Sequence, residues 1–366
     1  MRRYADDKEL CSRTHVRPAS EKYGAPMLVV HRGDLQRVLH ASAINELVEI
    51  RTSQQVVNVD SNFEARVQLA SGKWVHGDIL MGADGIHSLV RKRIASCLGV
   101  NDRIAPTGDS AYRVTILRRK LAGEEEILQQ LDRGISTRWM GPRGHIMAYP
   151  MRKDRSLYNM VFVRLSKPGK ADSGNLWSEK GDLQEMMNFY QDWSPTVKRL
   201  ISYITPSELM EWPLNIHTTL PKWVVNKVAL LGDACHSMLP YLAQGAAQAI
   251  EDAGVLAVCL SMTANVPCAL GVYEAVRKTR AETIQSSATA MRAVLHLPDG
   301  PEQEERDRNM KGAGKPGAKN PDLWADRAFQ DLMWGVDVMS ETQAKWDALS
   351  GELLMQRPYS GGHEKS

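Results

Sequence analysis

Two aspartates in the sequence stand directly after short apolar runs, a position from which a carboxylate can bind a ligand. Asp233 follows the run 227–231 and Gly232, and Asp84 follows the run 78–82. When such a run is a strand that leads into a helix, the aspartate lies at the carboxyl edge of a sheet, where α/β proteins bind cofactors. Its oxygens then accept hydrogen bonds from ligand hydroxyl groups. Taken alone, an aspartate of this kind is more often an ordinary loop or capping residue. The neighbouring residues therefore decide whether it is interpreted as ligand-binding.

The residues that follow Asp233 indicate a tight turn into a helix. Gln244, Gly245 and Ala246 precede the stretch 248–262, which has helical periodicity and few breakers. Small side chains let the backbone approach a ligand closely, and the free N–H groups at a helix start favour negative charge. We therefore expect Gly245 and Ala246 to contact the same ligand as Asp233.

The overall composition excludes several classes of protein. With 46 basic and 43 acidic residues, the net charge of +3 is too small for a protein that mainly binds nucleic acid. The longest apolar runs fall far short of the roughly 20 residues that cross a membrane, so no transmembrane segment is expected. The five cysteines are odd in number and show no Cys-x-x-Cys spacing, which argues against disulfides and a metal site and indicates a reducing, cytoplasmic compartment. The sequence does not determine an oligomeric state.

The chain divides into stretches of different character, and two of them must position Asp84 and Asp233. Residues 1–104 and 223–297 contain the two aspartates and are predicted to form the cofactor-binding sheet and its helices. Residues 105–222 contain short β-like runs separated by charged or Gly/Pro-containing breaks, which is typical of an antiparallel sheet with flanking helices. Residues 298–321 are rich in glycine, proline and charge and are predicted to be a loop. A final helix and a disordered tail are expected over 322–366. The fold class is therefore α/β.

Three motifs occur in a definite order along the chain. They are 31–35, His-Arg-Gly-Asp-Leu; 82–91, Gly-Ala-Asp-Gly-Ile-His-Ser-Leu-Val-Arg; and 232–253, which begins Gly-Asp-Ala-Cys-His-Ser-Met-Leu-Pro and includes Gln-Gly-Ala and Ile-Glu-Asp-Ala. Together they resemble the single-component FAD-dependent aromatic hydroxylases, most closely the salicylate hydroxylase branch and its fungal biosynthetic relatives. Each motif alone is a weak signal, but the ordered set is specific, and the resemblance extends over about residues 28–340.

This resemblance implies a monooxygenase that uses FAD, takes electrons from NADH or NADPH, and transfers one atom of O₂ to an electron-rich small molecule, typically an aromatic one. Fungal secondary metabolism is an expected setting. The resemblance also implies cofactor-binding roles for Arg32, Asp84 and Asp233, together with Gly245 and Ala246 at the helix start. Arg32 matches the family's FAD-contacting arginine, and a guanidinium suits a phosphate or a ring carbonyl.

Arg113 and Tyr149 resemble the arginine and tyrosine that mark the active site in some fungal relatives, and we expect them to be the catalytic residues. Arg113 would anchor a substrate carboxylate or phenolate, and Tyr149 would hydrogen-bond a substrate hydroxyl. Their spacing matches that of the family only approximately. The alternative is that both are packing residues of edge strands.

The sequence departs from the family before His31. The family begins with a strand, a Gly-x-Gly-x-x-Gly turn and a helix that hold the ADP half of FAD, and the residues before His31 contain no such unit. We therefore expect an N-terminally shortened member with an incomplete nucleotide-binding sheet and weak FAD binding. Two alternatives stay open: a non-catalytic flavoprotein remnant, and an epoxidase or decarboxylating hydroxylase of the same superfamily. Ala243 also replaces the usual glycine before Gly245, which would restrict the turn.

Overall fold

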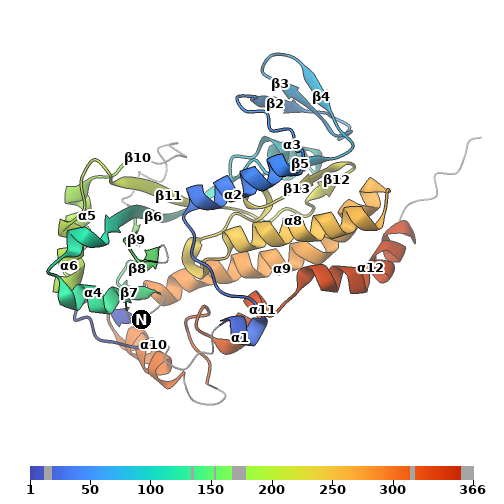
Figure 1. The fold of residues 1–366 in the computed structure, drawn as a ribbon. Coiled ribbons are helices and arrows are strands. Elements are labelled where there is room, and N and C mark those ends of the chain that lie inside the picture. Colours follow the sequence, from blue (N-terminus) through green and yellow to red (C-terminus); the bar gives the residue numbers. More distant parts are fainter. Residues whose placement is uncertain (12–18, 133–135, 152–153, 167–178, 314–317, 356–366) are drawn as a thin grey trace, which may run out of the picture. The chain divides into compact units, whose positions relative to one another are not determined.

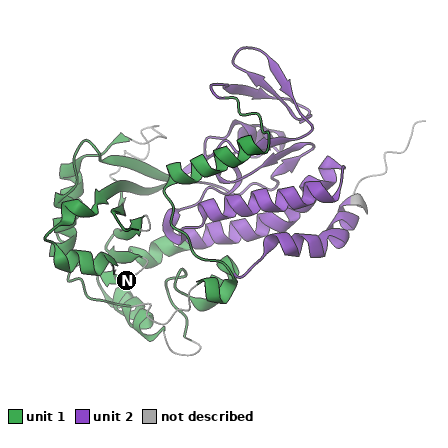
Figure 2. Cartoon of the chain, in the orientation of Figure 1, with its two compact units in different colours: residues 1–51, 106–215, 290–334 green, residues 52–105, 216–289, 335–366 purple. Residues whose placement is uncertain are grey.

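The chain forms two compact units, each assembled from three segments (Figure 2). The computed structural model describes residues 1–11, 19–132, 136–151, 154–166, 179–313 and 318–355. Unit 1 comprises residues 1–51, 106–215 and 290–334, and unit 2 comprises residues 52–105, 216–289 and 335–366.

The divisions between the units differ in part from the expected domains. The expected change at residue 104 lies next to the passage from unit 2 to unit 1 between residues 105 and 106. Residues 1–51 belong to unit 1, whereas their sequence predicts that they form part of the cofactor-binding region. The tail expected at the C-terminus lies outside the described residues from 356 onward.

Unit 1 is built on a seven-stranded sheet in the order β1-β7-β8-β9-β6-β11-β10 (Figure 1). Its strands are β1 (Arg2–Arg3), β6 (Ile104–Leu117), β7 (Thr137–Gly141), β8 (Gly144–Met151), β9 (Leu157–Leu165), β10 (Glu179–Lys180) and β11 (Met210–His217). Three long neighbouring strands, β8, β9 and β6, pair antiparallel over most of their length. This arrangement confirms the antiparallel sheet that the sequence predicted.

One face of this sheet forms the core of unit 1. Successive side chains of a strand point to opposite faces, and on β6 the alternate residues Tyr112, Val114 and Ile116 are all buried. These residues cluster with buried side chains of three helices, including Leu131 and Leu200. The helices are α4 (Glu125–Asp132), α5 (Leu183–Phe189) and α6 (Pro195–Ser202). The opposite face of the same strands is therefore left for other contacts.

The described residues of unit 1 also contain the helices α1 (Ala19–Tyr23), α2 (Arg32–Asn45), α10 (Pro301–Gly312) and α11 (Arg327–Trp334). The loop predicted over 298–321 is wrong for its first half, which forms α10. Pro301 and Glu302 begin this helix, and both residue types are favourable in a first turn. Arg306 is buried and donates a hydrogen bond to the carbonyl oxygen of Val294. The segment therefore packs as part of the unit and is not a linker.

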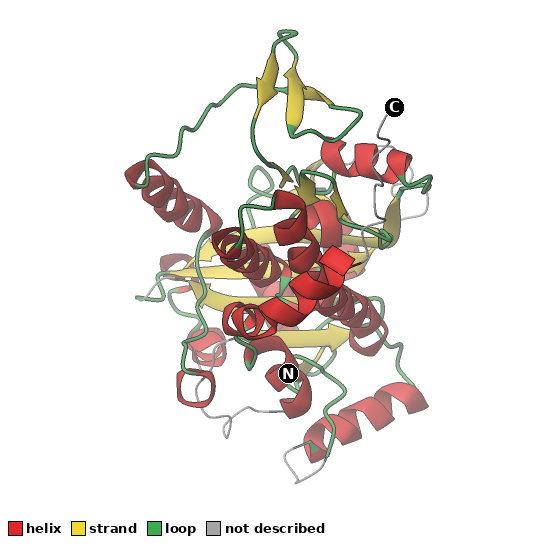
Figure 3. Cartoon of the chain, turned by 90° about the vertical axis from the view of Figure 1, so that its right-hand side faces the viewer, coloured by secondary structure: helices red, strands yellow, loops and turns green. Residues whose placement is uncertain are grey.

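Unit 2 contains two small sheets, β12-β13-β5 and the antiparallel β2-β3-β4 (Figure 3). The strands are β2 (Val56–Val59), β3 (Arg66–Leu69), β4 (Trp74–His76), β5 (Leu80–Gly82), β12 (Val224–Val225) and β13 (Val228–Leu230). The helices are α3 (Leu89–Cys97), α7 (Asp233–His236), α8 (Gly245–Met262), α12 (Val338–Met355) and α9 (Val266–Leu295), which continues into unit 1. The core of unit 2 includes Ile94, Leu230, Val255 and Tyr273.

Within the described residues, α8 is the one helix long and apolar enough to cross a membrane. Gln248 and Asp252 on this helix are fully buried, and both bond to Arg277 of α9. The helix also packs against α12. These contacts place one side of α8 in the core of unit 2; the length and composition of a single helix are weak evidence for a membrane span.

Candidate functional site

Two parallel strands bring Asp84 and Asp233 to one edge of the β12-β13-β5 sheet. β13 pairs with β5 in parallel, with Leu230 opposite Gly82, so both strands end at the same side. Each aspartate follows the end of its strand, as the sequence predicted. Gly82 is required for the close packing of α3, because a Cβ atom there would lie 2.7 Å from the Cβ of Val90.

Asp233 lies at the start of a single helical turn, α7, and its side chain is exposed. The preceding Gly232 has φ +59° and ψ −139°, a conformation that is open only to glycine without strain. A Cβ at Gly232 would also approach the Cβ of Ala249 to 3.3 Å. The Gly-Asp pair is therefore needed for both the turn and the outward carboxylate.

The N-terminus of α8 supplies backbone donors. The first N–H group bonded within this helix is that of Gln248, which donates to the carbonyl oxygen of Gln244; the earlier N–H groups have no partner in a helix. Gly245 is half-buried and Ala246 is exposed, so small side chains leave the backbone open to an anionic ligand. Just before them, Ala243 adopts a left-handed conformation with φ +53°, the strain expected where glycine is usual.

The carboxylate of Asp84 already caps a helix. It accepts hydrogen bonds from the hydroxyl of Ser88 and from the N–H of Leu89, at 2.7 Å, at the start of α3. A second residue of the same motif, Arg91, is fully buried and donates to Asp102 and to the carbonyl oxygens of Ala234 and Cys235. The motif thus shapes this edge of the sheet, and a direct cofactor contact of Asp84 stays a prediction.

Arg113 and Tyr149 share the open face of the seven-stranded sheet in unit 1. Arg113 on β6 pairs with Val161 on β9, while Asn159, two residues earlier on β9, pairs with Tyr149 on β8. Paired residues point to the same side of a sheet, as do residues two apart on one strand. Both side chains therefore lie opposite the buried core that contains Tyr112 and its neighbours.

The electrostatic setting of Arg113 is positive. Burial by neighbouring groups lowers its pKa first, the charge of Arg32 lowers it further, and Tyr149 acts in the other direction. The guanidinium also lies over the ring of Trp212, 5.9 Å from the centroid. Burial raises the pKa of Tyr149, so its hydroxyl stays protonated and able to donate. Arg32 and Tyr149 thus both influence Arg113 within unit 1.

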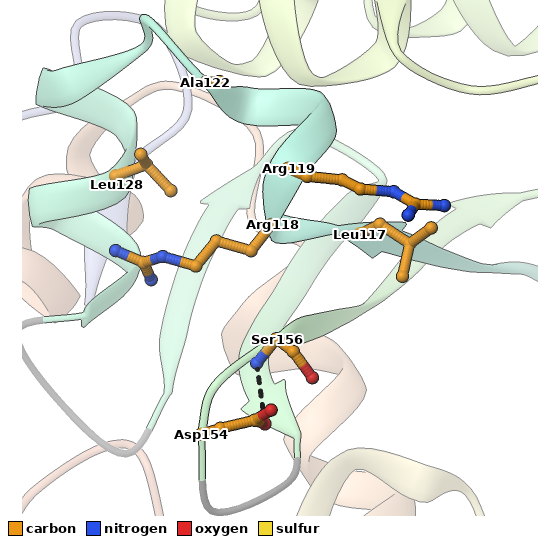
Figure 4. A pocket seen from close by; sticks show the side chains of 7 residues that line it. All are labelled: Leu117, Arg118, Arg119, Ala122, Leu128, Asp154 and Ser156. Carbon is orange, nitrogen blue, oxygen red and sulfur yellow. Dashed lines mark hydrogen bonds between the residues drawn. The ribbon is translucent and has the colours of Figure 1, made fainter.

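A separate open pocket of about 560 Å³ lies at the end of β6 (Figure 4). Its lining consists of Leu117, Arg118, Arg119, Ala122, Leu128, Asp154 and Ser156. Arg118 is already bonded to Asp132 and to the hydroxyl of Tyr158. None of the predicted site residues lines this pocket, so it is not the candidate site.

A buried cluster formed by α7 and α8 is not predicted by the sequence. Ligand atoms of Cys235, His236 and Asp252 lie within 4.8 Å of one another. Burial raises the pKa of the Cys235 thiol well above its usual range, and Asp252 is already paired with Arg277. A protonated thiol and a neutralised carboxylate are poor metal ligands, so the cluster is a hydrogen-bond network. The third motif contains Asp252, but nothing local in the sequence identifies Arg277 as its partner.

Comparison with known proteins agrees with these features. Residues 8–288 match a family described as an FAD binding domain. The chain belongs to this family of FAD-dependent monooxygenases. It is 38% identical over 324 residues to an FAD-dependent monooxygenase, atnJ, of an Arthrinium species, which covers 87% of this chain and 73% of that protein.

Other similar proteins extend the comparison. The chain is 33% identical over 300 residues to 3-hydroxybenzoate 6-hydroxylase 1 of Aquipseudomonas alcaligenes, covering 80% of this chain and 71% of that one. The fold is similar to that of a salicylate hydroxylase substrate complex, with a TM-score of 0.76, 24% identity, and coverage of 93% and 80%. The α/β fold, the monooxygenase class and FAD as cofactor are thereby confirmed.

The residues at the edge of the unit 2 sheet fit the hydroxyl and phosphate groups of FAD. The exposed Asp233 carboxylate suits hydroxyl donors, and the α8 N-terminus suits an anionic group. The letters Gly-x-Gly-x-x-Gly occur in this sequence at 312–317. They follow the helix α10 instead of a strand, and residues 314–317 lie outside the described residues, so this string is not the family's nucleotide-binding turn.

Proposed function

We propose that this monooxygenase hydroxylates an electron-rich aromatic compound that carries an anionic group, bound on the open face of the unit 1 sheet. The observation that carries the proposal is the strand register that gives Arg113 and Tyr149 one face, together with the positive setting of Arg113 beside Arg32. A carboxylate or phenolate would compensate this positive charge. The aromatic ring of Trp212, beside Arg113, would add apolar contact.

Each group would have a definite task. Arg113 would bind the anionic group of the substrate, and the protonated hydroxyl of Tyr149 would donate to a substrate oxygen. Asp233 would accept hydrogen bonds from FAD hydroxyls, while the N–H groups of Gly245 and Ala246 would donate to an anionic group of the cofactor. When bound, FAD supplies the redox chemistry: it is reduced by NADH or NADPH and activates O₂.

The names of related proteins support this substrate class. One relative, 30% identical over 298 residues, is the 3-amino-4-hydroxybenzoate 2-monooxygenase of Streptomyces cremeus. A second is the 3-hydroxybenzoate 6-hydroxylase described above. Both act on aromatic compounds with an anionic carboxylate, as their names state.

We infer that the chain works in the cytoplasm, since all five cysteines are free thiols.

The test is substrate-dependent oxidation of NADH and of NADPH by the flavin-loaded protein. The panel pairs hydroxybenzoates and aminohydroxybenzoates with the corresponding benzamides, which keep the ring but lose the charge. We expect turnover of at least one acid and at least tenfold lower kcat/KM for its amide. Product analysis then separates hydroxylation from epoxidation and decarboxylation. Equal turnover of acids and amides would contradict an anion site.

A further inference from the structure

We propose that Asp252 is a positioning residue that holds Asp233 in place for FAD, with Arg277 as its anchor. The proposal rests on the role of Asp233 as a hydroxyl-binding residue. It concerns contacts within unit 2 that the sequence did not reveal.

The turn that carries Asp233 is too short to hold its own shape. α7 contains four residues, Asp233–His236, and one turn of helix gains few internal hydrogen bonds for the backbone order it needs. One oxygen of Asp252 spans this turn. Its Oδ2 accepts the N–H of Gly232 at 2.9 Å and the Nε2–H of His236 at 2.7 Å. Asp233 lies between these two attachment points.

The other oxygen of Asp252 is fixed by Arg277. The Nε of Arg277 donates to Oδ1 at 2.8 Å, and its Nη2 donates to the side-chain oxygen of Gln248 at 2.7 Å. A further bond joins Arg277 to Glu251. Asp252, Arg277 and His236 are all 0% exposed. In a buried environment of low dielectric, hydrogen bonds between charged groups are strong. They therefore hold the carboxylate of Asp252 in one orientation.

The chemistry of this network requires a carboxylate. Every partner of Asp252 is a donor: a backbone N–H, an imidazole N–H and a guanidinium N–H. An asparagine would place its NH₂ group against one of these donors, which leaves a buried pair unsatisfied. The Nδ1 of His236 is buried with no hydrogen-bond partner, so the ring is oriented through the hydrogen bond between its Nε2 and Asp252.

A second clamp acts on the far end of the turn. Arg91 of α3 donates to the carbonyl oxygens of Ala234 and Cys235, at 3.1 and 3.2 Å, while Asp102 holds its guanidinium. The backbone on both sides of Asp233 is therefore held by buried charges. The free carboxylate is the one part of the turn that faces outward, and Asp252 sets the direction in which it points.

The test is a double-mutant cycle on FAD affinity, measured by equilibrium dialysis, which reports weak as well as tight binding. The four proteins are the unchanged chain, Asp233→Ala, Asp252→Asn, and the double variant. We expect Asp252→Asn to weaken FAD binding at least tenfold when Asp233 is present and less than twofold when Asp233 is alanine. Equal effects in the two backgrounds would show a merely structural role and overturn the proposal, as would unchanged affinity of Asp252→Asn.

Two further measurements distinguish a failure of the proposal for Asp252 from a failure of the underlying role of Asp233. Loss of affinity in Asp233→Ala tests the underlying role of Asp233, and an unchanged affinity there would overturn that role and this proposal together. Should Asp252→Asn fail to fold, Arg277→Lys, which keeps the charge but loses the bond to Gln248, takes its place with the same expected pattern. Glu282→Gln on α9, whose carboxylate pairs with Lys278, is the matched control and should leave FAD affinity unchanged.

Discussion

The two candidate sites are built in opposite ways. In unit 2, the turn that carries Asp233 is held at both ends by buried ion pairs, Arg91 with Asp102 and Arg277 with Asp252. In unit 1, Arg113 projects from a regular strand, and the groups that act on its pKa are another arginine and a tyrosine. A cofactor has a fixed shape, so its site gains from rigidity. A substrate site formed by side chains on one face of a regular sheet can change those side chains without disturbing the backbone. Such changes allow substrate specificity to differ between related enzymes.

The largest expected effect is a loss of stability on removing a buried ion pair that holds the cofactor-binding turn of unit 2. Asp252→Ala removes a fully buried carboxylate and leaves the Nε–H of Arg277 and two further N–H donors without their acceptor. Breaking a buried ion pair costs about 3–5 kcal/mol. We expect a loss of this size in the free energy of unfolding, measured by urea denaturation. Arg113→Met, on the open face, should change it by less than about 0.5 kcal/mol. Similar losses in both variants would remove the distinction.

The second prediction concerns acid stability and a buried histidine pair in unit 1. Nδ1 of His145 and Nε2 of His296 lie 2.8 Å apart, and burial lowers the pKa of His296 from 6.5 to about 4. The unfolded chain then binds more protons than the folded one, so stability is full above pH 6.5 and falls as the pH drops toward 4. For His296 alone, the loss is on the order of 3 kcal/mol.

The measurement is the free energy of unfolding between pH 7 and pH 4 in the unchanged chain and in His296→Asn. The variant should show a shallower dependence on pH. His217 in unit 2 also has a lowered pKa through burial, so some dependence should remain. A variant with the same slope as the unchanged chain would refute the assignment to His296.

The third prediction tests the proposed substrate-binding residues of unit 1. Arg113→Met should lower kcat/KM for an aromatic acid about 10- to 150-fold, because a hydrogen bond to a charged group contributes about 1.5–3 kcal/mol. Tyr149→Phe should cost less, about 2- to 10-fold, since a neutral hydrogen bond contributes about 0.5–1.5 kcal/mol. FAD affinity should not change in either. Arg119→Met, an exposed arginine at the separate pocket, is the control, and an equal effect there would count against Arg113.

The sequence predicted the parts of these sites that depend on local patterns. Gly232 and Asp233 follow an apolar run directly, and Gly245 follows within the same motif, so strand end, turn and helix start could be recognised together. Arg113 and Tyr149 sit in β-like runs whose alternation already separates two faces. These signals involve neighbours in the chain, which is why they could be interpreted without a structure.

What the sequence did not reveal depends on distant partners. Arg277 is 25 residues from Asp252 and on another helix, and no local pattern distinguishes a buried arginine from a solvated one. The capping role of Asp84 depends on where α3 begins. The helix α10 was missed because nearby glycines and prolines indicated a loop, while the burial of Arg306 against the rest of unit 1 provides stability that composition does not record.

The smallest expected effect tests the strain beside the cofactor turn. Ala243 has φ +53° and ψ +36°, a left-handed conformation that costs a residue with a Cβ about 1–2 kcal/mol. Ala243→Gly removes this cost but gives the unfolded chain more freedom, worth about 0.4–1 kcal/mol. A net gain of up to about 1.5 kcal/mol in the free energy of unfolding should result. Ala247→Gly, the same substitution inside α8, should lose about 0.5–1 kcal/mol. The two changes must therefore differ in sign, and a loss of stability in both would show that the turn is not strained at Ala243.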